Sequence, residues 1–219
     1  MRRKQLDVWY PSVDEFMNIL LSHPLDAVVR EYVFQGTPYV FRDRPEMFTL
    51  LSHHLCSALN LTEQNVIVVG SAKIGFSLSP DNFPRGFSDQ SDIDVLVVDE
   101  GLFDRVWATV LKWHYPRRLS DLGRVDGGWA RERRKDLYWG WFVPDKIRFN
   151  GLSFPDVLKP LRDISTGWFN AFRSLSQYPE FAGRDISGRL YRTWDHALLY
   201  HVDGLRQIKD VVRTTKESV

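Results

Sequence analysis

The stretch VVGSAKIGFSLSPDNFPRGFSDQSDIDVLVVD, residues 68–99, decides the fold that this sequence predicts. Both of its ends are apolar and rich in β-branched residues. Residues 65–70 (NVIVVG) therefore predict a short strand that ends at Gly70, and residues 92–99 (DIDVLVVD) predict a second strand. Because the run from Val95 to Val98 leaves no polar face, we expect the second strand to be covered on both sides.

The segment between these strands begins with features that suit a phosphate group. Gly70 permits a tight turn, and a helical turn starting at Ser71 would present its free N–H groups and hydroxyl to an anion. The simpler role for Ser71 is a helix N-cap. Lys73 would add a positive charge near a triphosphate, although a surface lysine needs no such role. Residues 72–91 predict a long loop, which is uncommon in a compact domain unless it is functional.

Two carboxylates stand at the start of the second strand. Since strand side chains alternate, Asp92 and Asp94 point the same way, with Cα atoms about 6.6 Å apart. Two ionised carboxylates this close repel each other unless a cation lies between them. Mg²⁺ prefers such oxygen ligands together with substrate phosphates, and paired ions serve in-line displacement at phosphorus. The alternative is a strand end that merely carries exposed acids.

The residues VVGS…SDIDVLVV resemble the signature of the nucleotidyltransferase superfamily. This superfamily includes DNA polymerase beta, the minimal antitoxin-type nucleotidyltransferases and the bacterial oligonucleotide synthases of phage defence. The matching positions lie within about residues 66–99: Gly70, Ser71, Ser91, Asp92 and Asp94. The resemblance implies transfer of a nucleoside monophosphate from a ribo- or deoxyribonucleoside triphosphate, such as ATP, to an acceptor hydroxyl. It also implies Mg²⁺ or Mn²⁺ as cofactor, bound by Asp92 and Asp94, and a nucleotide held by Gly70, Ser71 and Lys73.

The sequence departs from this family's pattern in two ways. Residues 72–91 form a longer insertion than is usual between the Gly-Ser and the acid pair. The family's third carboxylate also has no clear counterpart: Asp145 is the first candidate for this metal ligand and Asp136 the second. A missing third acid would suit weak activity or a protein that only binds. The rival prediction is therefore an antitoxin-like or regulatory partner with a degenerate fold, bound to a toxin or effector encoded in the same operon.

The rest of the chain predicts helices around this core. Helical spacing appears at 13–34 with a break at Pro24, at 47–60 and at 102–113, and a third strand is expected near 136–149, interrupted at Pro144. From about residue 150 the pattern predicts helices, with one apolar stripe running from Leu190 to Ile208. We expect an α+β fold: a nucleotidyltransferase-type mixed sheet with flanking helices. Residues 1–219 would form one unit, with a catalytic core at about 45–150 and a helical C-terminal part at about 151–219.

Composition limits the class of protein. The 29 Lys and Arg residues nearly balance the 28 Asp and Glu residues, so no global charge demands a polyanionic partner. Cys56 is the sole cysteine, which excludes an intramolecular disulfide framework and a thiolate zinc cluster. No secretory signal and no apolar run of membrane-spanning length is evident, so we expect a cytoplasmic protein without a membrane partner.

A basic segment at residues 112–135 offers a further hypothesis. It holds Arg and Lys residues in excess over acids, and Trp129, Trp139 and Trp141 lie in or near it. Such a segment could bind single-stranded nucleic acid through stacking and phosphate contacts. The alternative is a solvated basic loop beside core tryptophans.

Overall fold

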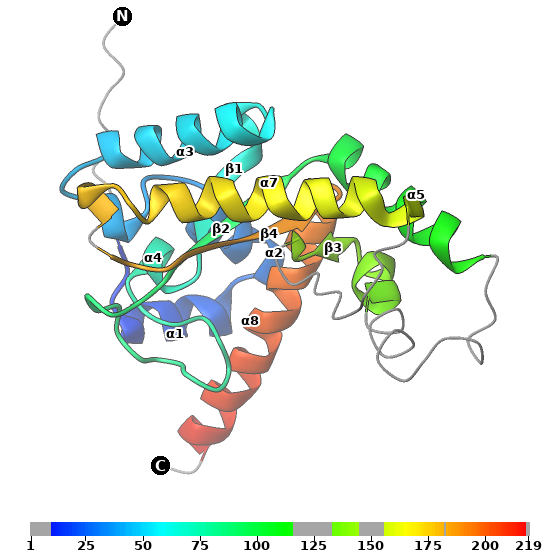
Figure 1. The fold of residues 1–219 in the computed structure, drawn as a ribbon. Coiled ribbons are helices and arrows are strands. Elements are labelled where there is room, and N and C mark those ends of the chain that lie inside the picture. The colour runs from blue at the N-terminus through cyan, green and yellow to red at the C-terminus, as the bar shows by residue number, and fades with distance from the viewer. Residues whose placement is uncertain (1–9, 116–132, 145–155, 182, 218–219) are drawn as a thin grey trace, which may run out of the picture.

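Four strands form one mixed sheet with helices on both faces (Figure 1). The computed structural model describes residues 10–115, 133–144, 156–181 and 183–217. The strands, in the order in which they lie in the sheet, are β1 (Val66–Val69), β2 (Ile93–Val98), β4 (Ile186–Tyr191) and β3 (Trp141–Phe142). Strand β2 runs antiparallel to β1 and parallel to β4, and β3 runs antiparallel to β4. The α+β class and the mixed sheet are confirmed.

Helices divide between the two faces of the sheet. One apolar core lies between the sheet and α3 (Glu46–Leu59), α5 (Glu100–His114) and α7 (Lys159–Leu175). The other lies between the sheet and α1 (Val13–Ser22), α2 (Leu25–Val28), the π-helix η1 (Val29–Phe34) and α8 (Trp194–Glu217). Figure 1 shows α7 crossing in front of the sheet, while α8 descends behind it.

Strand β2 contributes to both cores, as its sequence predicts. Ile93, Val95 and Val97 pack into the α3/α5/α7 core, whereas Leu96 and Val98 pack into the α1/α8 core. Asp94 lies on the α1/α8 side and is exposed, although every other residue of the strand is buried. A single acidic side chain therefore interrupts an otherwise apolar strand.

Local sequence signals set the helix ends. Pro24 separates α1 from α2, and Ser12 and Glu15 form a capping box at the start of α1. Asn60 adopts the left-handed conformation that ends α3. The side chain of Asp99 accepts a hydrogen bond from Leu102 N at 2.6 Å, which starts α5 directly after β2. The predicted helices of this half of the chain are confirmed.

The prediction of helix around residue 190 is wrong. Residues 186–191 form β4, which lies beside β2 in the middle of the sheet. Its side chains alternate: Ile186, Gly188 and Leu190 face α7, and the intervening residues face α8. Leu190 lies four residues before Trp194, which matches the helical spacing of the apolar stripe on α8. The pattern therefore predicts a helix that begins too early and includes the strand.

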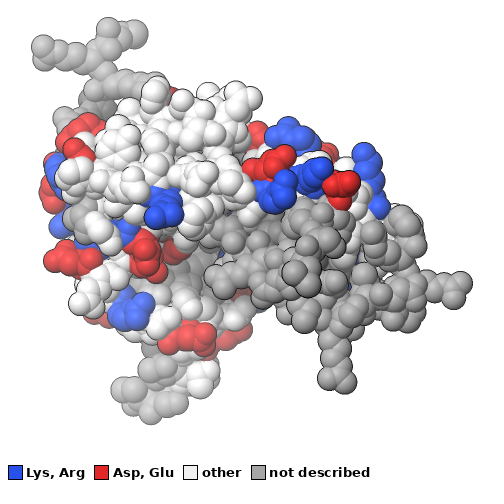
Figure 2. All heavy atoms as spheres, in the orientation of Figure 1, with Lys and Arg blue, Asp and Glu red and all other residues white. Residues whose placement is uncertain are grey.

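The predicted third strand is present only as β3, two residues long. Residues 133–138, which overlap the start of the predicted strand, are helical. Acidic and basic side chains are interspersed over the described part of the face drawn in Figure 2. Within the described ranges, no helix has both the length and the apolar character that crossing a bilayer requires.

Candidate metal and nucleotide site

A tight turn after β1 brings the backbone against Asp94. Gly70 follows the strand with φ +67°, a conformation that side chains disfavour, and α4 (Ser71–Ile74) begins at the next residue. Val69 pairs with Asp94 across the antiparallel ladder. A Cβ atom on Gly70 would lie 3.0 Å from Asp94 Oδ2. The expected turn and helix start at Gly70-Ser71 are confirmed, and a side chain at position 70 would crowd the carboxylate.

Asp92 and Asp94 lie at the same end of β2. Asp94 is the second residue of the strand and Asp92 directly precedes it, and both are exposed. Their electrostatic coupling is direct, because the negative charge of Asp92 contributes to raising the pKa of Asp94. The two acids that the sequence singled out are therefore neighbours at an open end of the sheet, where a ligand can reach them.

Strand β4 adds residues to the site that the sequence analysis missed. Ser187 pairs with Asp94 across the parallel ladder, and its hydroxyl donates to Asp94 Oδ1 at 3.4 Å. Arg189, two residues further along the same face, has its guanidinium carbon 4.7 Å from the ring centre of Trp141 and 4.4 Å from that of Tyr200. The site thus combines an acid pair with a nearby hydroxyl and an aromatic-held cation.

The pKa of Asp94 is raised above its ordinary value. Surrounding protein atoms remove water from the carboxyl group, which is the largest cause, and the charge of Asp92 adds to it. The Ser187 hydroxyl and the Arg189 guanidinium act in the opposite direction and do not outweigh these effects. The ionised pair is therefore electrostatically unfavourable by itself, and a bound divalent cation would relieve the repulsion.

Exposure decreases along β2 and β4 on the face toward α8. Asp94 and Ser187 are exposed, whereas Leu96 and Tyr191 are buried in the α1/α8 core. His201 of α8 lies at this buried end, where loss of hydration, with the charge of Arg189, lowers its pKa to about 4. The site therefore lies at the solvated end of two strands whose other ends are covered by α8.

Lys73 occupies a different position from the one that a triphosphate ligand would suggest. Its side chain is buried, and Nζ donates to the carbonyl of Gly36 at 2.6 Å and also to the carbonyl of Gln35. Burial lowers its pKa to about 8. Lys73 thereby links α4 to the end of η1, and this contact engages its ammonium group. Its nucleotide-binding role stays a prediction that this geometry does not favour.

The two candidates for a third carboxylate have different outcomes. Asp145 lies outside the described residues. Asp136 is buried on the helical segment 133–138, where Oδ2 lies 2.7 Å from Arg133 Nη1. This segment leads into β3, which pairs with the end of β4 about 13 Å along the strand from Ser187. The geometry therefore does not favour Asp136 as a ligand shared with Asp94.

Within the described part of the chain, no group of three or more Asp, Glu, His or Cys side chains is placed to hold a metal ion. Two acids and a hydroxyl remain as oxygen donors at the site: Asp92, Asp94 and Ser187. These are hard ligands of the kind that Mg²⁺ and Mn²⁺ accept, and they leave coordination positions for substrate oxygens.

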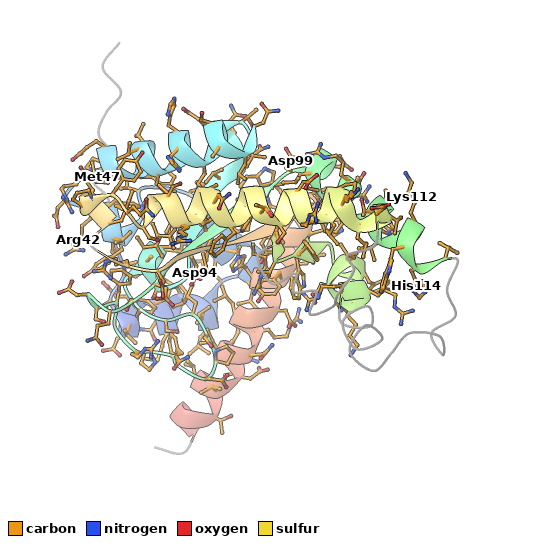
Figure 3. All side chains as sticks on the ribbon, viewed as in Figure 1. Arg42, Met47, Asp94, Asp99, Lys112 and His114 are labelled. Carbon is orange, nitrogen blue, oxygen red and sulfur yellow. The ribbon has the colours of Figure 1, made fainter. Side chains whose placement is uncertain are left out.

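The basic segment at 112–135 falls mainly outside the described residues. At its edges, Lys112 and His114 end α5 (Figure 3), and Trp139 is exposed. Trp141 belongs to β3 and contacts Arg189. The hypothesis of a single-strand-binding segment stays a prediction.

Comparisons with protein-family models, curated proteins and solved structures found no match to this chain.

Proposed function

We propose that the protein is a metal-dependent nucleotidyltransferase. An acceptor hydroxyl would attack the α-phosphorus of a nucleoside triphosphate, the bond to the β-phosphate oxygen would break, and pyrophosphate would leave. The proton of the attacking hydroxyl would pass to solvent. The acceptor would be a nucleotide, a nucleic-acid end or a protein hydroxyl.

One observation carries the proposal: a glycine turn lies against the exposed acid pair. Gly70 stands where any Cβ would approach Asp94 Oδ2 to 3.0 Å, and Asp92 raises the pKa of Asp94. Two surface acids that bind no ligand have no need to lie next to each other, and no need of the Gly70 backbone so close to Asp94. Both features suit a site in which metal-bound phosphate oxygens lie between the carboxylates and the turn.

The residues of the site have distinct proposed roles. Asp92 and Asp94 would hold Mg²⁺ or Mn²⁺, which supplies charge neutralisation at the phosphates. Ser71 would present its backbone N–H, since the first amides of a helix lack partners within it. Ser187 orients Asp94 through its hydroxyl. Catalysis at such a site depends mainly on positioning and on charge stabilisation.

A second candidate function is a binding partner with a degenerate nucleotidyltransferase fold, such as an antitoxin-like regulator of a toxin or effector. The observation that favours it is Ser187. The strand position directly opposite Asp94 carries this hydroxyl residue and not a third carboxylate. Under this alternative, Asp92→Ala would leave the biological effect intact. A role in phage defence, with a signal oligonucleotide as product, is an expectation that rests on the sequence resemblance.

Labelled substrates distinguish the two functions. The protein would be incubated with each labelled ribo- or deoxyribonucleoside triphosphate and Mg²⁺ or Mn²⁺, with products and protein both analysed for label. We expect incorporation by the wild type, and a loss of at least about 100-fold in Asp92→Ala/Asp94→Ala. The matched control, Asp163→Ala/Asp210→Ala, removes two exposed acids on α7 and α8. Absence of binding and turnover with every triphosphate would reject the enzyme.

A further inference from the structure

A polar cavity of about 270 Å³ opens beside the loop that leads into the acid pair. Three arginines and two aromatic residues contribute to its lining: Arg42, Arg44, Arg184, Tyr39 and Phe87. The arginines come from two parts of the chain more than 130 residues apart, so the fold assembles the cluster. None of these residues is one of the motif positions, although Phe87 lies in the loop at residues 72–91.

Two of the guanidinium groups are held in place by aromatic rings. The Arg42 guanidinium carbon lies 4.1 Å from the ring centre of Tyr39, and that of Arg184 lies 4.9 Å from the ring centre of Phe87. The two rings are themselves in edge contact, with centres 6.1 Å apart. A guanidinium stacked on a ring can still form in-plane hydrogen bonds. Arg42 Nη1 donates to the carbonyl of Tyr39 at 3.0 Å, and Arg184 donates to residues 88–91. The rings and these hydrogen bonds therefore fix the positions of two positive charges in the lining.

The charge in the cavity favours an anion. Arg44 is exposed and forms no ion pair among the described residues. Two acids also line the cavity, and each is paired with one of its arginines: Asp43 Oδ2 lies 3.4 Å from Arg42 Nε, and Asp89 Oδ1 lies 3.1 Å from Arg184 Nη2. Both acids are strongly exposed, at 81% and 107%, so water screens their charge more than that of Arg184, which is 14% exposed. Three arginines against two acids leave the lining with a net positive charge.

The cavity adjoins the proposed metal site. Arg184 Nη1 donates to the carbonyls of Ser88 at 2.7 Å and of Ser91 at 2.8 Å, and Ser91 directly precedes Asp92. Three residues of chain lead from Asp89 to Asp92, which spans at most about 10 Å. The carbonyl of Asp185, next to Arg184, accepts from Ile93 N at 2.9 Å. Arg42 and Asp94 both come from the left half of the molecule in Figure 3.

We infer that this cavity binds a phosphate group of the acceptor, so that the acceptor is a nucleotide or an oligonucleotide and not an unphosphorylated hydroxyl compound. The inference rests on the proposed function, because it assigns the acceptor side of the same reaction. Arg42 and Arg44 contact the phosphate. Arg184 positions the loop that joins the cavity to Asp92 and contributes positive charge.

Binding of a short RNA tests this inference. The affinity of a fluorescent single-stranded RNA pentamer with a free 3′-hydroxyl would be measured by anisotropy over a series of salt concentrations. In Arg42→Gln/Arg44→Gln we expect affinity to fall about tenfold or more, because charged hydrogen bonds to phosphate are lost. The slope of log K against log salt should become shallower by about 1–2.

The matched control is Arg162→Gln. Arg162, like Arg42, is an exposed arginine that is followed by an aspartate. Its Nε lies 4.0 Å from Asp163 Oδ1, and Arg42 Nε lies 3.4 Å from Asp43 Oδ2. It lies near the start of α7, whereas the cavity lies beyond the end of that helix, about 20 Å along its axis. Affinity and salt slope should stay at wild-type values. Circular dichroism would confirm that all variants are folded.

The outcomes separate this inference from the proposed function. Competition by inorganic phosphate or a nucleoside monophosphate at similar concentrations would identify a mononucleotide acceptor, and competition by RNA alone an oligonucleotide. No RNA binding, or equal binding by Arg42→Gln/Arg44→Gln, would overturn the inference even if triphosphates are turned over. Tighter binding of a phosphoserine peptide would overturn it in favour of a protein partner. Loss of turnover in Asp92→Ala/Asp94→Ala with RNA binding retained is the result that the two proposals together predict.

Discussion

Asp94 is the single residue of the central strand whose side chain is exposed, and each of its contacts bears on charge. The Gly70 backbone and the Ser187 hydroxyl lie beside its oxygens, while Asp92 raises its pKa. The ionised form of a carboxylate in this setting is less stable than that of a carboxylate in water. Such perturbed acids at an open position are candidate functional groups with a stated physical reason.

Removing this charge should stabilise the metal-free protein. A group whose pKa is raised on folding loses stability as the pH rises through its folded pKa, which for Asp94 lies above the unfolded value of about 3.9. Asp94→Asn should match the wild type below this range and melt on the order of 1–2 °C higher at neutral pH. Thermal melts from pH 3 to 8 in a metal chelator would measure this.

Mg²⁺ should reverse that order by stabilising the wild type and leaving Asp94→Asn unchanged. Asp210→Asn, an exposed acid on α8, serves as control and should respond to Mg²⁺ as the wild type does. A wild type that is more stable than Asp94→Asn in chelator at every pH would show that the carboxylate is not electrostatically disfavoured.

Gly70→Ala should damage the site beyond its effect on the backbone. Gly70 and Gly183 both have positive φ, at +67° and +69°, so alanine at either position should destabilise the fold by about 1–3 kcal/mol. Only at Gly70 would the new methyl group meet a carboxylate oxygen, since nothing lies within 4 Å of a Cβ at Gly183. We expect metal affinity to fall in Gly70→Ala alone. Equal metal affinity in the two folded variants would contradict the proposed close contact at Asp94.

At the scale of elements, strand β2 was predictable and its partner β4 was not. The run from Val95 to Val98 has no polar face, which identifies a strand buried on both sides. In β4 the alternation of Ile186, Gly188 and Leu190 with polar neighbours was the available signal. Leu190 masks this signal, because it also fits the helical stripe of α8. Gly188 is the position where the Phe172 ring of α7 packs against the strand. Since glycine has no apolar side chain, the alternating pattern that predicts a strand is weakened there.

The same limit explains which site residues were missed. Ser71, Asp92 and Asp94 are separated by one turn and one loop, so a local motif reveals them. Ser187 lies 93 residues from Asp94 and reaches it only through parallel strand pairing. Lys73 shows the converse error: its position beside Ser71 in sequence suggested a phosphate contact, whereas α4 directs it toward η1.

The Lys73 contact between α4 and η1 should have a pH signature. Burial lowers its pKa from 10.5 to about 8, so the folded state loses stability as the pH falls from 10.5 through 8 and the ammonium becomes charged. Relative to Lys73→Met, the wild type should gain on the order of 2 kcal/mol in free energy of unfolding between pH 8 and pH 10.5. Urea unfolding of both proteins at a series of pH values would measure the difference. A difference that is constant over this range would show that Lys73 keeps its ordinary pKa.

At the scale of the whole molecule, two helical layers enclose a mixed sheet and leave one end of β2 and β4 uncovered. The proposed metal site lies at that end, and the arginine-lined cavity adjoins it through the loop at residues 88–91. This placement follows from β1, β2 and β4 together, because the acid pair, the glycine turn and Ser187 belong to different strands. The fold thus gathers the candidate donor and acceptor sites on one side of the molecule.

The central claim is that Asp92 and Asp94 hold a divalent metal ion. The most direct measurement is a titration with Mn²⁺ followed by electron paramagnetic resonance, in the presence and absence of a nucleoside triphosphate. We expect the wild type and Asp163→Ala/Asp210→Ala to bind Mn²⁺, more tightly with the triphosphate, and Asp92→Ala/Asp94→Ala to bind at least about tenfold more weakly. Equal Mn²⁺ binding by the folded Asp92→Ala/Asp94→Ala protein, or none by the wild type, would contradict the claim.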